Sequence, residues 1–147
     1  MFESCRAKQE KVKQLFSGAT TPEEKYQILV DLGKEQPRLQ PDEKTEATRV
    51  HGCQSRTYLK TVCENDRIYF YTESDALISA GLGQLSTMVY SGEPPEVVLR
   101  CPPTYLEELG IRASLSPGRA NGLSNILLRL RQEAVKYFPG SLRSIEP

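Results

Sequence analysis

The residue of this chain best suited to chemistry is Cys53. It lies in a run that reads Val-His-Gly-Cys-Gln-Ser-Arg over residues 50–56, with a glycine before it and polar residues after it. We call residues 51–56 the Cys53 loop. The run predicts a thiol at a loop tip rather than in the core. A thiolate is the nucleophilic form of cysteine, and nearby positive charge from Arg49, Arg56 or His51 would favour it. The alternatives are a metal ligand and an inert, buried side chain.

His51 is the only histidine. It could act as a base toward Cys53, but a solvated histidine at the end of a strand is the alternative. The other thiols are Cys5, Cys63 and Cys101, and no two cysteines have the C-x-x-C spacing of a redox pair or a zinc ribbon. A site combining several cysteines with the histidine matches no familiar zinc spacing, so we predict no metal site. Cys63 is expected to pack within a strand.

A second unusual stretch spans residues 116–122 and reads Ser-Pro-Gly-Arg-Ala-Asn-Gly. A proline and two glycines at the start of a helix allow the backbone to approach another group closely. Arg119 within it could hold an anion or stabilise a thiolate. The alternative is a helix cap with a surface arginine. Asp75 is expected near the start of another helix, where a carboxylate complements the helix dipole.

Composition excludes several classes of function. The chain has 147 residues, and its 19 basic and 19 acidic residues cancel. No overall basic field would attract nucleic acid or an anionic membrane. No apolar run approaches the length of a membrane span, and the first residues are charged, so a cytoplasmic protein is expected. We predict one domain over residues 1–147, with a core at about 8–138 and a loose tail at 139–147.

The elements that must position Cys53 follow from local signals. Thr21 and Pro22 predict a helix start, and Asn65-Asp66 predicts a hairpin turn between strands at 57–64 and 67–72. A short strand at 48–50 completes a small antiparallel sheet of about three strands, covered by helices on one face, which gives an α+β fold. The other helices are predicted at 4–16, from Ser74 to Tyr90, at 95–99, at 103–109 and at 117–138. Core contacts are predicted at Ala76, Leu77, Ala80, Leu85, Met88 and Val89, and along the last helix at Leu123, Ile126, Leu127, Leu130 and Ala134.

Several of these stretches together resemble one family. They are Gly-Cys-Gln-Ser at 52–55, Ser-Asp-Ala-Leu-Ile at 74–78 with Gly-Leu at 81–82, Tyr-Leu-Glu-Glu-Leu-Gly-Ile at 105–111, and residues 115–123. In this order, from about residue 8 to 137, the chain resembles the SufE family and its close relative CsdE. It departs from the family in having Thr57-Tyr58 where Val-Trp is common, and Gly118 where serine is usual.

The resemblance implies a sulfur acceptor with a SufE/IscU-like fold. Cys53 would take persulfide sulfur from a SufS-type cysteine desulfurase, stimulate that enzyme, and pass the sulfur to a cluster scaffold such as SufB. The chain would be a carrier and activator with no cofactor of its own, because the pyridoxal phosphate belongs to the desulfurase. The family is also dimeric and can shelter its resting cysteine in an apolar pocket. Arg119 would support the cysteine, and the partner-binding residues would be His51, Gly52, Gln54, Ser55, Arg56 and Asp75.

Two alternatives to a sulfur carrier stay open. One is an IscU-like cluster or zinc scaffold, which needs about four ligands brought together. The other is a non-catalytic interaction module in which Cys53 is incidental. Metal analysis separates the scaffold from the carrier, and an alkylation mass measurement separates the carrier from the module.

Overall fold

The computed structural model describes residues 1–138, so the tail predicted at 139–147 lies outside the described residues. Its sheet is a single hairpin, in which β1 (Thr57–Glu64) pairs antiparallel with β2 (Arg67–Ser74) along its whole length. Asn65 and Asp66 join the strands, and both have positive φ, 51° and 62°. Two left-handed residues are what a tight two-residue hairpin turn requires, so the predicted turn is confirmed.

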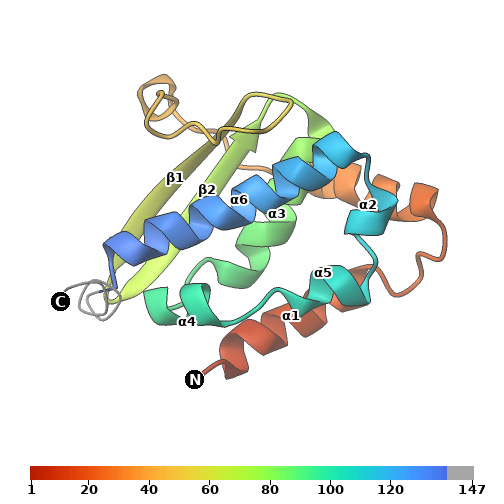
Figure 1. Cartoon of the computed structure of the whole chain (residues 1–147), viewed down its shortest axis with the longest axis horizontal. Coiled ribbons are helices and arrows are strands. Elements are labelled where there is room, and N and C mark those ends of the chain that lie inside the picture. The colour runs from red at the N-terminus through yellow and green to blue at the C-terminus, as the bar shows by residue number, and fades with distance from the viewer. Residues whose placement is uncertain (139–147) are drawn as a thin grey trace.

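Within residues 1–138, six α-helices pack with the hairpin into one structure, which confirms the α+β class. α3 contacts β2, α1, α2 and α6 and is the centre of the molecule. Figure 1 shows α6 crossing in front of the hairpin and α3, with α1 along the edge away from the hairpin's open end. The helices are α1 (Glu3–Leu15), α2 (Pro22–Lys34), α3 (Leu77–Tyr90), α4 (Pro95–Arg100), α5 (Thr104–Glu108) and α6 (Pro117–Lys136), with 3-10 turns η1 (Pro41–Glu43) and η2 (Arg112–Ser114).

Two helices begin where the sequence predicts. The Thr21 hydroxyl accepts the backbone N–H of Glu24 at 3.2 Å, ahead of α2. The Ser116 hydroxyl accepts a backbone N–H at 3.4 Å in the same way, ahead of α6. In both cases a proline follows the cap, where its missing N–H costs nothing. The start of α6 is therefore fixed locally, and this start borders the candidate site.

The predicted third strand is wrong. Residues 48–50 make only a single bridge, between Arg49 and Tyr58 of β1. The chain turns at 46–48 just before the bridge and at 51–52 just after it, so no further residues can align with β1. The sheet therefore has two strands, and the segment before the Cys53 loop is attached to the edge of β1 at one point.

The predicted start of α3 at Ser74 is also wrong. Ser74 is the last residue of β2, and its hydroxyl lies 3.0 Å from the Thr57 hydroxyl across the hairpin. Because Ser74 completes the strand pair, α3 begins three residues later, at Leu77. Ala80, Leu85 and Val89 are buried as predicted, whereas Ala76 is exposed and Leu77 and Met88 are 47% and 36% exposed.

Two glycines bring α2 and α3 into backbone contact. A Cβ atom on Gly81 would lie 2.0 Å from the carbonyl oxygen of Leu29, and one on Gly33 would lie 2.2 Å from the carbonyl oxygen of Leu77. No side chain fits at either place unless the helices separate. The predicted apolar stripe of α6 is confirmed and buried against the rest of the core: Leu123, Ile126, Leu127, Leu130 and Ala134 are each at most 4% exposed.

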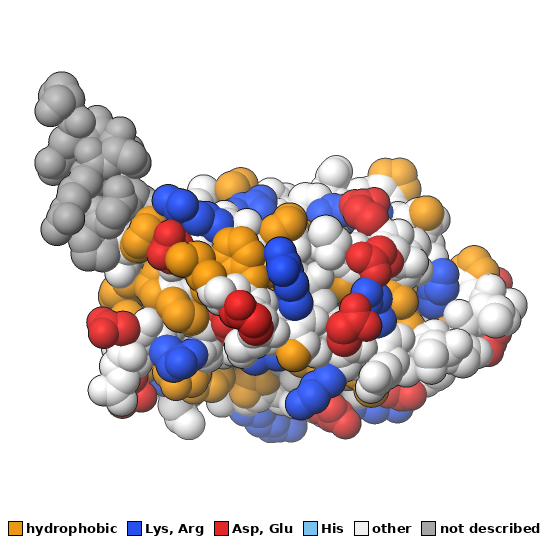
Figure 2. Space-filling view, turned by 90° about the horizontal axis from the view of Figure 1, so that it is seen from below, with side chains coloured by type: hydrophobic (Ala, Val, Ile, Leu, Met, Phe, Trp, Pro, Cys, Tyr) orange, Lys and Arg blue, Asp and Glu red, His pale blue; other side chains and the backbone are white. Residues whose placement is uncertain are grey.

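The surface mixes charges of both signs. On the face shown in Figure 2, acidic and basic side chains are interspersed among apolar ones. That face therefore presents no basic field of the kind that binds nucleic acid. Within residues 1–138, no helix combines the length and the apolar character needed to cross a membrane.

Candidate functional site

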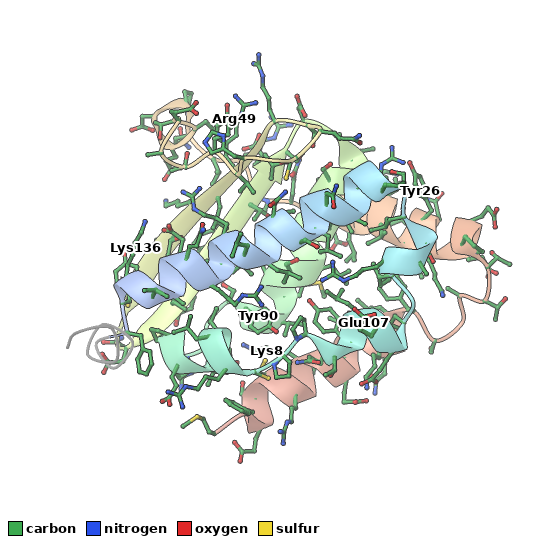
Figure 3. All side chains as sticks on the ribbon, in the orientation of Figure 1. Lys8, Tyr26, Arg49, Tyr90, Glu107 and Lys136 are labelled. Carbon is green, nitrogen blue, oxygen red and sulfur yellow. The ribbon has the colours of Figure 1, made fainter. Side chains whose placement is uncertain are left out.

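The Cys53 loop lies between the hairpin and α6. In Figure 3, Arg49 marks the segment that enters the loop near the open end of the hairpin, and Tyr26 lies beside the first turns of α6. The loop is thus positioned by elements on both sides: the ends of β1 and β2 on one side, and the N-terminal half of α6 on the other. Its own residues form no helix or strand before Thr57.

The Cys53 thiol points toward α6 and is partly buried. Its Sγ lies 3.7 Å from the carbonyl oxygen of Gly122, and the side chain packs against the hydrophobic core. It borders a cavity of about 10 Å³, which is close to the smallest volume that holds one water molecule. The polar neighbours of Cys53 predicted a loop thiol apart from the core, and the structure corrects this: the loop carries the thiol to the edge of the core, in line with the sheltered cysteine that the family resemblance implies. The cavity is lined by Cys53, Gln54, Ser79, Leu82, Gly118, Arg119, Gly122 and Ile126.

The electrostatics of the resting thiol differ from the sequence prediction. Burial raises the pKa of Cys53 above its ordinary value of 9.0, and a hydrogen bond with Thr57 offsets only part of that rise. Arg56, expected to favour the thiolate, is exposed and is engaged through its backbone. The resting position therefore favours the neutral thiol, which is the less nucleophilic form.

The pH dependence of alkylation tests this resting state. Because the pKa of Cys53 is raised, less of it is thiolate at pH 7 than in a free cysteine. We expect its rate of reaction with iodoacetamide to keep rising through pH 9, with a midpoint above that value. The folded protein is alkylated at pH values from 6 to 11 and then digested. Mass spectrometry of the fragment that contains Cys53 gives the alkylation rate at each pH.

The matched control is a synthetic peptide covering residues 49–58, which has the same neighbours in sequence but no fold. Its midpoint should lie below that of the folded protein. A protein midpoint below that of the peptide would mean that the fold favours the thiolate, contrary to the burial seen here.

Arg119 and His51 do not hydrogen-bond the thiol in this arrangement. Arg119 lines the cavity, but its guanidinium lies over the ring of Tyr26, 5.5 Å from the ring centre. The Nε2 atom of His51 lies 3.3 Å from Glu46, and the His51 side chain is 65% exposed. Among the hydrogen bonds of the described residues, none joins either side chain to Cys53. Arg119 thus lies beside the cavity, but its guanidinium is not hydrogen-bonded to the sulfur. His51 faces solvent.

The end of the hairpin holds one side of the loop. The Arg56 N–H donates to Asp75 Oδ1 at 3.0 Å, and the Asp75 N–H donates to the Arg56 carbonyl at 3.1 Å. The Ser55 hydroxyl lies 3.0 Å from that of Ser74. The prediction that Asp75 complements a helix dipole is wrong, since no acidic residue lies in the first turn of α3. Asp75 instead extends the strand pairing to the edge of the Cys53 loop.

α6 holds the other side, through residues that the sequence did not single out. The Asn125 side-chain N–H donates to the Gly52 carbonyl at 3.1 Å. Arg129, one turn later, donates to backbone carbonyls just before the loop. The Gln54 amide lies over Gly118, where a Cβ atom would come within 2.1 Å of its nitrogen. A serine at position 118 would displace Gln54. The close contact with Gln54 therefore explains why glycine stands here in place of the serine that is usual in the family.

The other three cysteines are placed differently. Cys5 and Cys101 are buried, and burial together with its neighbour Cys101 raises the pKa of Cys5 to about 12. Cys63 is partly buried within β1, as predicted. Within residues 1–138, no three histidine, cysteine, aspartate or glutamate side chains are grouped so that they could hold a metal ion.

Comparison with known proteins finds similar sequences and a similar structure. Residues 10–134 match the model of a family described as "SufE: Fe-S metabolism associated domain". The sulfur acceptor protein CsdE of Escherichia coli is 36% identical over 117 residues, which is 78% of this chain and 80% of that protein.

Two further relatives extend the comparison. The SufE-like protein 1 of Arabidopsis thaliana, named as chloroplastic/mitochondrial, is 31% identical over 135 residues, and the match spans 91% of this chain but 36% of that protein. The solution structure of a hypothetical protein from Thermus thermophilus superposes with a TM-score of 0.71 at 27% identity, covering 88% of this chain and 95% of that one.

Proposed function

This chain belongs to the SufE family of proteins associated with Fe-S metabolism, and we propose that it carries sulfur on Cys53 from a cysteine desulfurase toward iron–sulfur cluster assembly. The observation that carries this proposal is the placement of the thiol. Cys53 lies in a loop and borders a small cavity, whereas Cys5 and Cys101 are buried and Cys63 is part of a strand. A carrier needs a thiol that can be both sheltered and presented.

The proposed step is an exchange at sulfur. The Cys53 thiolate attacks the outer sulfur of a persulfide on the desulfurase, and a new S–S bond forms at Cys53. The S–S bond on the desulfurase breaks, and its electron pair leaves on the desulfurase cysteine as a thiolate. No net oxidation occurs, because one persulfide is exchanged for another. Such attack requires an accessible thiolate at the moment of transfer.

The resting position protects Cys53 and keeps it from reacting. A thiol that faces the core with a raised pKa is a poor nucleophile toward small molecules. For transfer, the Cys53 loop must leave α6 so that the sulfur can meet the sulfur of the partner. Movement of a loop into a partner's active site on encounter is a common gating step. The hydrogen bond that holds the loop against α6, from Asn125 to Gly52, joins neutral groups and contributes about 1 kcal/mol net, so docking can supply the free energy for this movement.

Partners and location follow from the family resemblance and belong to the same proposal. The donor is a pyridoxal-phosphate desulfurase of SufS type, and the acceptor is a cluster scaffold such as SufB. We propose the cytoplasm as the location, where thiols stay reduced. The homodimer implied by the resemblance, the supporting role of Arg119 and the partner-binding role of the Cys53 loop with Asp75 stay predictions.

The experiment is direct. The purified protein is incubated with a pyridoxal-phosphate cysteine desulfurase and cysteine, then analysed by mass spectrometry before and after dithiothreitol. We expect a gain of one sulfur atom, located on the Cys53 peptide and removed by dithiothreitol, together with faster desulfurase turnover. A protein that gains no sulfur, or gains it on another cysteine, would overturn the carrier assignment.

A further inference from the structure

α6 contacts the Cys53 loop closely at Gly52. The Asn125 side chain donates to the Gly52 carbonyl at 3.1 Å. Gly52 has a φ of +86°, which side-chain-bearing residues rarely adopt, and a Cβ atom there would lie 2.3 Å from the Asn125 amide nitrogen. The amide therefore rests directly against the backbone of the residue that precedes Cys53.

Arg129 holds the segment before the loop more firmly. Its guanidinium donates to the Arg49 carbonyl at 2.8 Å and also to the Ala47 carbonyl. Glu133 orients it through a contact at 3.3 Å. The Arg129 side chain is only 17% exposed. Hydrogen bonds from a charged donor are stronger than those between neutral groups, so residues 47–49 are the fixed stem of the loop.

The far side of the loop is also fixed. Two hydrogen bonds join Arg56 and Asp75, one between backbone groups and one from the Arg56 N–H to the Asp75 carboxylate, and Ser55 is joined to Ser74. Between these two fixed ends, the described polar contacts to α6 are the Asn125 bond and the long contact of Cys53 Sγ with the Gly122 carbonyl. A sulfur donor 3.7 Å from its acceptor makes a weak bond. The Asn125 bond is therefore the main polar restraint that α6 places on the segment that carries Cys53.

We propose that Asn125 is a positioning residue that keeps Cys53 in its resting cavity, and that breaking its bond to Gly52 releases the thiol. Arg129 stays bonded and keeps the stem in place, so the moving segment is short. This inference rests on the proposed sulfur transfer for its purpose, but the release itself is a property of the free protein. The bond sets how often the loop is open before any partner arrives.

The test measures that opening without a desulfurase. In Asn125→Ala the rate of Cys53 alkylation by iodoacetamide at fixed pH should rise about three- to tenfold, the factor that one neutral hydrogen bond is worth. Asn125→Asp should do the same, since the isosteric carboxylate has no N–H to donate. Gln132→Ala is the matched control, because Gln132 lies on the same helix and, like Asn125, lines a groove that α6 forms with Val50 and His51. It should react like wild type.

Cys63 is the internal reference in each digest, since it lies in β1 and its rate should not change. An unchanged Cys53 rate in both Asn125 variants would overturn the inference. So would a rise at Cys63 by the same factor as at Cys53, because that would indicate general loosening of the fold rather than release of the loop.

A second readout separates positioning from structural support. If the loop opens more often, a larger fraction of the molecules is able to bind the desulfurase. The apparent dissociation constant falls in proportion, so a lower protein concentration gives the same stimulation. In Asn125→Ala the concentration giving half-maximal desulfurase stimulation should fall by the same three- to tenfold, with the maximal rate unchanged. A lowered maximal rate with an unchanged half-saturating concentration would contradict it. If the wild-type protein gains no sulfur, the proposed function fails while the alkylation result still decides the role of Asn125.

Discussion

Cys53→Ser should abolish sulfur uptake and the stimulation of the desulfurase. Serine differs from cysteine by one atom, and its hydroxyl cannot form the persulfide that carries the sulfur. The fold should survive, since the side chain is only partly buried and its contact with the Gly122 carbonyl is a long one. The measurement is the protein mass after incubation with desulfurase and cysteine, alongside a thermal melt.

Cys63→Ser is the matched control for this prediction. Its thiol is also partly buried, but it lies within β1 instead of in the loop. It should gain one sulfur and stimulate the desulfurase like wild type. Sulfur uptake that persists in Cys53→Ser and is lost in Cys63→Ser would show that Cys63, and not Cys53, carries the sulfur.

Gly81→Ala should cause the largest loss of stability among single-methyl changes in this fold. The added carbon would lie 2.0 Å from the Leu29 carbonyl oxygen, which is backbone and cannot turn aside. α2 and α3 must then separate along their contact. Overpacking of this kind costs about 3 kcal/mol, more than the ~1 kcal/mol that alanine gains over glycine in a helix. We expect the melting temperature to fall by roughly 5–10 °C.

Gly18→Ala serves as the control, because no atom lies within 4 Å of the place where its Cβ would be. Its melting temperature should stay within a degree or two of wild type, or rise slightly, as the unfolded chain loses freedom. Equal melting temperatures for Gly81→Ala and wild type would show that the two helices can move apart at no cost.

Local signals in the sequence predicted the local structure well. The Asn65-Asp66 turn, the caps at Thr21 and Ser116 and the apolar stripe of α6 depend on neighbours within a few residues, and each is confirmed. The strand at 48–50 was wrong because β-branched composition does not show whether neighbouring turns leave room for pairing. The start of α3 was wrong because Ser74 can cap a helix or complete a hairpin, and only the pairing with Thr57 decides between the two.

The contacts around Cys53 could not be predicted from its neighbours in sequence, because they join segments far apart in the chain, and only the family resemblance implied a sheltered thiol. Asn125 is separated from Gly52 by 73 residues. Asn125 and Arg129 are four residues apart and share a face of α6, a spacing that the sequence shows plainly. Nothing in the sequence says that this face meets a loop. Polar neighbours suggested an exposed, activated thiol, whereas the fold turns it toward the core and raises its pKa.

In the proposed mechanism, sulfur moves from a desulfurase persulfide to Cys53. The most direct measurement is a single-turnover transfer, in which a desulfurase is charged with labelled sulfur from cysteine, freed of cysteine, and mixed with this protein. We predict that the label leaves the desulfurase and appears on the Cys53 peptide, up to one sulfur per chain, in a form that dithiothreitol removes. Label that stays on the desulfurase, or that is released as sulfide without appearing on Cys53, would contradict it.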